Sequence, residues 1–123
     1  MILSGNESRT LPIINYDEMK GTIHMQGRSI SPEVEDYFEE FIPYFKDCLL
    51  KNPTNLDVKL ELQYFNNKTA KILMDFFKVI KDIVDKGYDA NIEWLIEKGD
   101  EDLIEVIKDY IFLTDLKMKI IEE

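Results

Sequence analysis

The stretch QYFNNKTAKIL, residues 63–73, gathers the residue types of this chain that best suit phosphate chemistry. An extended apolar pattern stops here and a helical pattern begins. Thr69 is the one aliphatic hydroxyl in the stretch, and Lys68 and Lys71 lie close to it in the sequence. A helix start carries unpaired backbone N–H groups and the positive end of the helix dipole. The junction therefore favours either a capping side chain or an anion such as a phosphorylated hydroxyl.

Local sequence alone favours the structural interpretation, in which Asn66 or Asn67 caps the helix. A phosphate at the same place is physically reasonable because its negative charge would meet the helix dipole. Access to Thr69 depends on where the helix begins. If the helix is regular at Thr69, the side chain falls within the apolar arc of Ile72 and Phe76, which would hinder a kinase. If the helix starts later, Thr69 is free.

The rest of the chain offers few arrangements for catalysis. His24 is the single histidine and has no cysteine or second histidine beside it to complete a metal site, so we expect a structural or surface role. Cys48 lies on a predicted apolar helix face as a small core residue. The acidic run Glu97–Asp102 lacks the alternating oxygen ligands of an EF-hand and is typical of a solvated helix start. Because glycine-rich nucleotide loops are also absent, we expect no enzyme, metal or cofactor, and an enzyme using these acids is the least favoured class.

Composition limits the partners of the protein. The 123 residues fit one domain, and 25 acidic against 15 basic residues give a formal net charge of −10. This charge argues against binding to nucleic acid or to anionic membranes. One cysteine cannot form an intramolecular disulfide, and neither an apolar leader nor a membrane-length apolar run is present, so a cytoplasmic protein is expected.

Hydrophobic periodicity predicts alternating strands and helices after a loose lead-in over residues 1–11. The expected order begins with a hairpin at 13–16 and 22–25 and a helix that starts at Ser31-Pro32-Glu33, kinks at Pro43 and is ended by Lys51-Asn52-Pro53-Thr54-Asn55. A strand at 56–64, a helix closed by Lys86-Gly87, a strand at 90–96, a helix from Gly99 to about Tyr110, and a strand at 116–120 should follow. Crossover helices join the last three strands, which should therefore be parallel. The fold class is α/β, with a mixed sheet in a single domain over residues 12–123.

Three segments together resemble the SiaC family of bacterial regulatory phosphoproteins, whose fold is similar to the STAS domains of anti-sigma-factor antagonists. They are GTIHMQGRSISPE (21–33), LELQYFNNKTAK (60–71) and IEWLIEKGDEDLIE (92–105). The first resembles the family's G-x-L-x-I-x-G-R-S-I-P-E-N entry into helix one, and the second its L-E-Y-F-N-T-S-S-x-K junction. The third resembles its aromatic strand and acidic turn. The similarity runs from about Pro12 to Leu113.

The resemblance implies a non-enzymatic switch protein in cyclic di-GMP signalling. A histidine-kinase-like protein Ser/Thr kinase would phosphorylate it, a PP2C-type phosphatase would restore it, and the unphosphorylated form would bind and activate a diguanylate cyclase. The implied switch surface, named here for its residues at the start of the second helix, consists of Asn66, Asn67, Lys68 and Lys71. Gly27, Arg28 and Ser29 are expected to border it, with Arg28 pairing with an acid of the fold in preference to a phosphate.

The chain departs from the family pattern at the critical position. Aligning Tyr64-Phe65-Asn66 with Y-F-N places Asn67 at the family's phosphoacceptor threonine, Lys68 at the next serine and Thr69 at the second serine. Asparagine accepts no phosphoryl group. Either Thr69 has become the acceptor, which we favour on sequence, or the protein is fixed in its unphosphorylated binding state. A scaffold or small-ligand-binding module without phosphoregulation is the alternative function.

Overall fold

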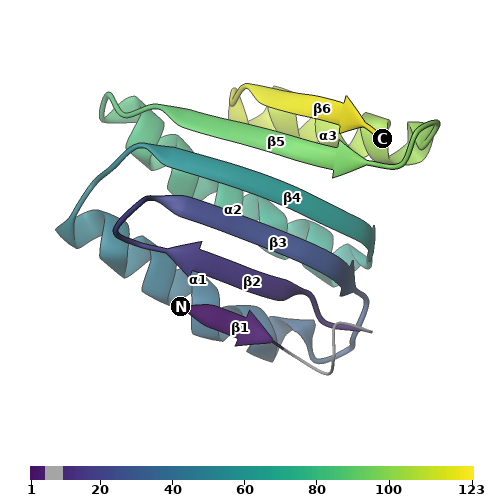
Figure 1. The fold of residues 1–123 in the computed structure, drawn as a ribbon, viewed down its shortest axis with the longest axis horizontal. Helices are drawn as coiled ribbons and strands as arrows, with labels where there is room; N and C mark the ends of the chain where they lie inside the picture. The colour runs from purple at the N-terminus through teal and green to yellow at the C-terminus, as the bar shows by residue number, and fades with distance from the viewer. Residues whose placement is uncertain (5–9) are drawn as a thin grey trace.

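One six-stranded sheet and three helices make up the described part of the chain, residues 1–4 and 10–123 of a computed structural model (Figure 1). The strands are β1 (Ile2–Ser4), β2 (Ile13–Asp17), β3 (Thr22–Ser29), β4 (Leu56–Phe65), β5 (Ala90–Ile96) and β6 (Met118–Glu122). The helices are α1 (Val34–Lys51), α2 (Asn67–Asp85) and α3 (Glu101–Thr114).

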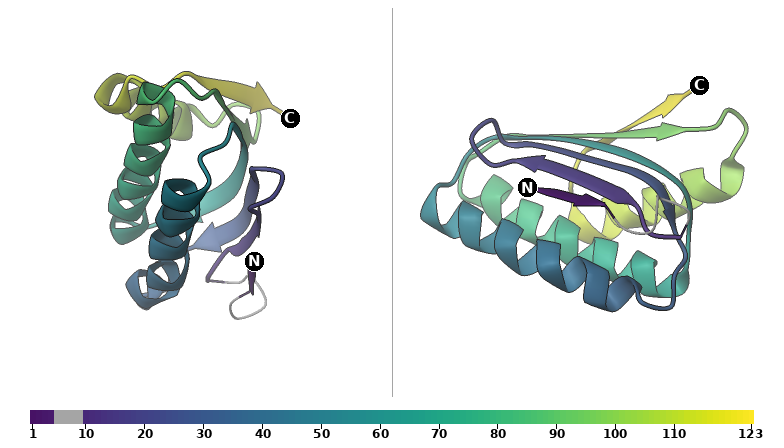
Figure 2. Two further views of the ribbon diagram at one scale, coloured as in Figure 1. Left: turned by 90° about the vertical axis from the view of Figure 1, so that its left-hand side faces the viewer. Right: turned by 60° about the horizontal axis from the view of Figure 1, so that its bottom comes forward.

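The strands lie in the sheet in the order in which they occur in the sequence. β1, β2 and β3 pair antiparallel, and β3 to β6 pair parallel through the three crossover helices. Because each crossover has the same hand and steps in the same direction, all three helices cover one face of the sheet (Figure 2). The carboxyl ends of β3 and β4 and the start of α2 consequently meet at one end of the molecule.

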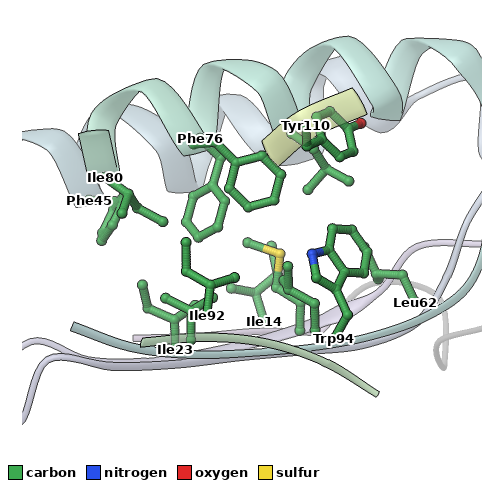
Figure 3. Packing of buried hydrophobic residues seen from close by; sticks show 14 of the residues in the cluster. Ile14, Ile23, Phe45, Leu62, Phe76, Ile80, Ile92, Trp94 and Tyr110 are labelled. Atoms are coloured by element: carbon green, nitrogen blue, oxygen red, sulfur yellow. The ribbon is translucent and has the colours of Figure 1, made fainter. Parts of the chain in front are cut away.

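The core lies between the sheet and the helices (Figure 3). Alternate residues of β4 and β5, such as Leu60 and Trp94, point into it and are fully buried. From the helices, Phe45 and Phe76 meet with their ring centroids 5.2 Å apart. Tyr110 stacks on Trp94 at 6.2 Å. Aromatic contacts therefore join all three helices and the sheet.

The predicted α/β class, the hairpin and the parallel strands joined by crossover helices are confirmed. The strands predicted at 22–25 and 116–120 run instead over Thr22–Ser29 and Met118–Glu122. Two predicted helix boundaries were also wrong. Helix α1 begins at Val34, because the Ser31 hydroxyl accepts a hydrogen bond from the N–H of Glu33 at 3.0 Å in the turn before the helix. Helix α3 continues past Tyr110 to Thr114 and ends where Asp115 adopts a left-handed conformation.

The lead-in expected over residues 1–11 contains a strand that the sequence pattern did not predict. Ile2–Ser4 pairs with β2, and the backbone N–H of Tyr16 donates to the carbonyl of Met1 at 2.8 Å. Three residues are too few to show a period, and the strand exists because the edge of β2 offers it a pairing partner. Residues 5–9 of the expected lead-in lie outside the described residues.

Candidate functional site

Asn66 caps the start of α2. Its backbone is extended, and its side-chain Oδ1 accepts a hydrogen bond from the N–H of Thr69 at 2.9 Å. Its carbonyl accepts the first helical bond, from Ala70 at 3.0 Å. Of the two asparagines that the sequence offered as caps, Asn66 is therefore the cap, and the helix is already regular at Thr69.

Thr69 is completely buried between β3 and α2. Its hydroxyl oxygen lies 2.9 Å from the carbonyl of Ser29 and 2.8 Å from Oδ1 of Asn66, so its single proton has two acceptors to serve. The Ser29 hydroxyl lies 2.8 Å away and can donate to the same oxygen. These contacts form a closed polar cluster, the Ser29–Asn66–Thr69 cluster, which ties the end of β3 to the first turn of α2.

This cluster restricts phosphorylation of Thr69. The side chain has no solvent-exposed surface, and its oxygen is surrounded by Ser29 and Asn66 at hydrogen-bond distance. A phosphoryl group would need the space that these partners occupy. Thr69 as the phosphoacceptor stays a prediction, and it requires the first turn of α2 to move away from β3.

Asn67, Lys68 and Lys71 are exposed on the first turns of α2. Asn67, which aligns with the acceptor of the SiaC-like motif, is the first residue of the helix and points to solvent. Lys68 lies 3.8 Å from the carboxylate of Glu35 on α1. Both side chains are more than half exposed, so this ion pair contributes little to the stability of the fold. The accessible part of the switch surface therefore carries two cations and an amide.

A β-bulge beside this surface turns an aromatic side chain outward. Gly27 pairs with Leu62 and Arg28 with Tyr64, so Gln63 is the extra residue on β4. Gly27 has a φ of +113°, a conformation that favours glycine. Beyond the bulge Tyr64 is 61% exposed, although the alternation of β4 predicts a buried residue there.

Arg28 lies over this tyrosine, with its guanidinium carbon 5.5 Å from the ring centroid. Within the described residues no carboxylate lies at ion-pair distance from Arg28, and its observed contact is the cation–π interaction with Tyr64 in place of the expected ion pair. Ser29, the third expected border residue, is buried in the Ser29–Asn66–Thr69 cluster. The sequence pattern did not predict that Tyr64 is exposed at this site. The sequence signal that could have indicated it is Gly27, because a glycine within a strand often marks a β-bulge.

The other candidate residues have structural partners. His24 lies 2.9 Å from the carboxylate of Glu61 on the helix-free face of the sheet. Asp100, in the acidic run, caps α3 by accepting from the N–H of Leu103 at 3.1 Å. Half-buried Cys48 donates to a carboxylate oxygen of Glu18, and burial raises the pKa of its thiol. No helix in the described ranges is long and apolar enough to cross a membrane.

The chain matches the family model described as "SiaC family regulatory phosphoprotein" over residues 5–123. It belongs to the SiaC family. A curated relative, an uncharacterized protein of Pseudomonas aeruginosa (strain UCBPP-PA14), is 22% identical over 103 residues, which cover 84% of this chain and 82% of the relative. The family resemblance read from the three sequence segments is thereby confirmed.

Two solved structures of the SiaC family share the fold. SiaC in the crystal structure of diguanylate cyclase SiaD in complex with its activator SiaC, from Pseudomonas aeruginosa, superposes with a TM-score of 0.90 at 20% identity, over 100% of this chain and 99% of that one. Apo-SiaC from the same organism gives a TM-score of 0.79 at 20% identity, over 98% of both chains. The described part of this chain therefore has the SiaC fold.

Proposed function

We propose that this SiaC-family chain regulates an effector enzyme by binding it, and that the effector is a diguanylate cyclase. The binding surface is the end of the molecule that carries the switch surface together with Arg28 and Tyr64. Tyrosine and arginine dominate the energetics of many protein interfaces because they offer large, partly rigid contact area. In the related complex SiaC is named as the activator of a diguanylate cyclase, which supports this class of partner.

We further propose that the protein is held in its binding-competent, unphosphorylated state. The observation that carries this proposal is the contrast between exposed Asn67, which cannot be phosphorylated, and fully buried Thr69, which can. The geometry thus favours the second of the two hypotheses that the sequence left open. A partner would meet two cations and an amide here at all times, without the two negative charges that a phosphate adds.

The second candidate is a switch at Thr69 operated by a histidine-kinase-like kinase and a PP2C-type phosphatase. The observation that favours it is the position of Thr69 in the first turn of α2, because helix ends open at low cost compared with the core. Phosphorylation would then trap the open turn, since a phosphate cannot return to the site between Ser29 and Asn66. The positive surface around Lys71 would be neutralised at the same time.

Phosphopeptide mapping separates the two candidates. The protein is incubated with ATP and the histidine-kinase-like kinase of its own organism, and the segment 66–71 is analysed in the wild type and in Asn67→Thr. We expect no modification of the wild type and modification at position 67 in the variant. Modification of the wild type at Thr69, absent in Thr69→Ala, would instead establish the second candidate. A SiaC-family protein with threonine at the aligned position shows that the kinase is active.

The binding surface is tested with the purified diguanylate cyclase of the same organism by calorimetry. Lys71→Glu should weaken binding by about tenfold, because it reverses a charge within the surface. Lys86→Glu is the matched control, since Lys86 is also exposed but lies at the opposite end of α2. Equal affinities for the two variants would place the interface elsewhere.

A further inference from the structure

Strands β4 and β5 separate before either of them ends. Their parallel register runs from the pair Leu56–Ala90 to the pair Leu60–Trp94. β4 then continues through Phe65 beside β3, and β5 continues through Ile96 beside β6. Within the described residues no further pair joins β4 to β5, and the gap between them widens toward their carboxyl ends (Figure 1).

A cavity of about 450 Å³ lies at this gap. Its aliphatic lining comes from Leu62 on β4, Leu95 and Ile96 on β5, and Leu103 on α3. In parallel sheets the space beyond the carboxyl ends of the strands is the usual place for ligands, and this volume lies in the range of ligand pockets. The cavity also reaches Tyr64 and Arg28, so it opens beside the proposed partner-binding surface.

The backbone along the gap is suited to an extended ligand. Residues Glu61–Phe65 lie in β4 and pair with β3 except at the bulged Gln63, and no strand among the described residues pairs with them on the other side. On either side of the bulge, such an edge offers N–H and C=O groups in the spacing of a strand. Addition of an extended segment to such an edge, including insertion into an existing sheet, is a recurring way in which proteins recognise peptides.

The charge of the cavity selects the kind of segment. Its lining includes the carboxylates of Glu61, Glu97, Asp100 and Glu123, against one cation, Arg28, which is engaged with Tyr64. Asp100 caps α3 and Glu61 contacts His24. Glu97 and Glu123 have no ion-pair partner anywhere in the described ranges. A lysine or arginine side chain entering from the gap would meet both of them.

We propose that the gap between β4 and β5 binds an extended segment of a partner protein, which pairs with the backbone of Glu61–Phe65 and places a lysine or arginine between Glu97 and Glu123. The inference rests on the proposed function, because the segment is taken to belong to the effector enzyme that this protein regulates. It describes a second contact beside the switch surface, and its test needs no partner protein. Failure of this test therefore leaves the binding at Lys71 unaffected, and the two proposals can fail separately.

The test is an NMR titration of the isotope-labelled full chain with two capped pentapeptides, Ac-Val-Lys-Val-Arg-Val-NH₂ and Ac-Val-Glu-Val-Asp-Val-NH₂, up to millimolar concentration. We expect the basic peptide to shift the amide signals of residues 61–65 and 95–97 and to slow amide hydrogen exchange in 61–65. The acidic peptide should do neither. Absence of these changes, or equal changes with both peptides, would overturn the proposal.

Charge reversal gives the matched variants. The double variant Glu97→Lys with Glu123→Lys should weaken binding of the basic peptide at least tenfold, whereas Glu39→Lys with Glu40→Lys, on the exposed side of α1, should leave it unchanged. An equal loss of affinity for the basic peptide in both double variants would show that the net charge of the protein explains the effect, and would contradict the proposal. Capped lysine amide is titrated in parallel, and shifts as large as those of the peptide would indicate a small-cation site in place of a segment site.

Discussion

Thr69 shows at the scale of one residue how burial changes the meaning of a hydroxyl. In the sequence it is the one aliphatic hydroxyl at a strand-to-helix junction, next to two lysines. In the fold it belongs to the Ser29–Asn66–Thr69 cluster and holds β3 against α2. The hydroxyl that would make it a phosphoacceptor therefore links β3 to α2, and the contribution of this link to the free energy of unfolding can be measured.

Replacement of Thr69 by alanine should destabilise the protein by about 1–3 kcal/mol more than replacement by serine. Alanine leaves the Ser29 hydroxyl without its buried partner, although Oδ1 of Asn66 keeps the backbone N–H of residue 69, whereas serine keeps the hydroxyl and removes only a methyl group. The free energy of unfolding is measured by urea denaturation, with an unchanged m-value as the check that the unfolded states are alike. Equal losses for the two variants would show that the cluster contributes nothing beyond packing.

At the scale of elements, the turn between β2 and β3 depends on one glycine. Gly21 has a φ of +70°, and its carbonyl accepts from the N–H of Asp57 at 2.8 Å, which brings the turn against the start of β4. A Cβ atom at this position would lie 2.2 Å from the carbonyl oxygen of Asn55. The hairpin and β4 can be adjacent here only because the residue has no side chain.

Gly21→Ala should therefore cost about 1–3 kcal/mol more than Gly99→Ala. Gly99 is the matched control because its φ of +87° carries the same left-handed strain, while a Cβ there would meet open space. The difference isolates the backbone collision from the conformational strain, and thermal unfolding of both variants measures it. Equal midpoints would mean that the turn moves away from Asn55 at no cost.

At the scale of the whole molecule, three helices on one face of the sheet concentrate the aromatic residues in a single layer. Phe76 of α2 has its ring centroid 6.0 Å from that of Phe41 and 5.2 Å from that of Phe45, both on α1, and 5.5 Å from that of Phe77. The packing of α1 against α2 above the sheet depends on this ring. Phe112 on α3 is, in contrast, 85% exposed.

Phe76→Ala should lower the free energy of unfolding by about 3–5 kcal/mol, because it leaves a cavity between two helices and the sheet. Phe112→Ala makes the same chemical change at the surface and should stay within about 0.5 kcal/mol of the wild type. Chemical denaturation of the two variants makes the comparison. A large loss for Phe112→Ala would reveal a contact that the monomer does not contain.

Alkaline pH should destabilise the whole fold through its buried tyrosines. Burial raises the pKa of Tyr16 and of Tyr110 well above the ordinary value, with Cys48 and Glu18 adding to the effect at Tyr16. Both phenols must stay protonated in the folded protein. Their contribution to the free energy of unfolding is fully present below about pH 10, the ordinary pKa of tyrosine. It is lost as the pH rises toward the pKa that these groups have in the folded protein.

In that interval the unfolded chain binds fewer protons, so the free energy of unfolding should fall by about 1.4 kcal/mol per pH unit for each buried tyrosine. Denaturation between pH 9 and 12 measures the slope, and phenolate absorbance should rise together with loss of circular dichroism. Tyr16→Phe should remove the share of one tyrosine from this slope. A slope unchanged by Tyr16→Phe would show that this phenol ionises in the folded state.

Several features follow from the sequence by itself. Alternating residues in β4, helical stripes in α2 and the glycine after Lys86 determine the elements because periodicity and backbone freedom are local properties. The family was also recognisable, since three ordered motifs survive at low overall identity. The junction that carries the candidate site could be located to within a few residues, because a strand that runs into a helix exposes the same backbone groups.

Only the tertiary structure decided what those residues do. Burial of Thr69 depends on Ser29, forty positions away in the sequence, and no local pattern reports such a contact. The exposure of Tyr64 depends on the register between β3 and β4, where one bulge reverses the side-chain alternation. β1 and the gap between β4 and β5 likewise arise from pairing between distant segments. Periodicity indicates which face of a helix or strand is apolar. The positions of the neighbouring elements in space decide which side chains are buried, which are hydrogen-bonded to one another and which are exposed.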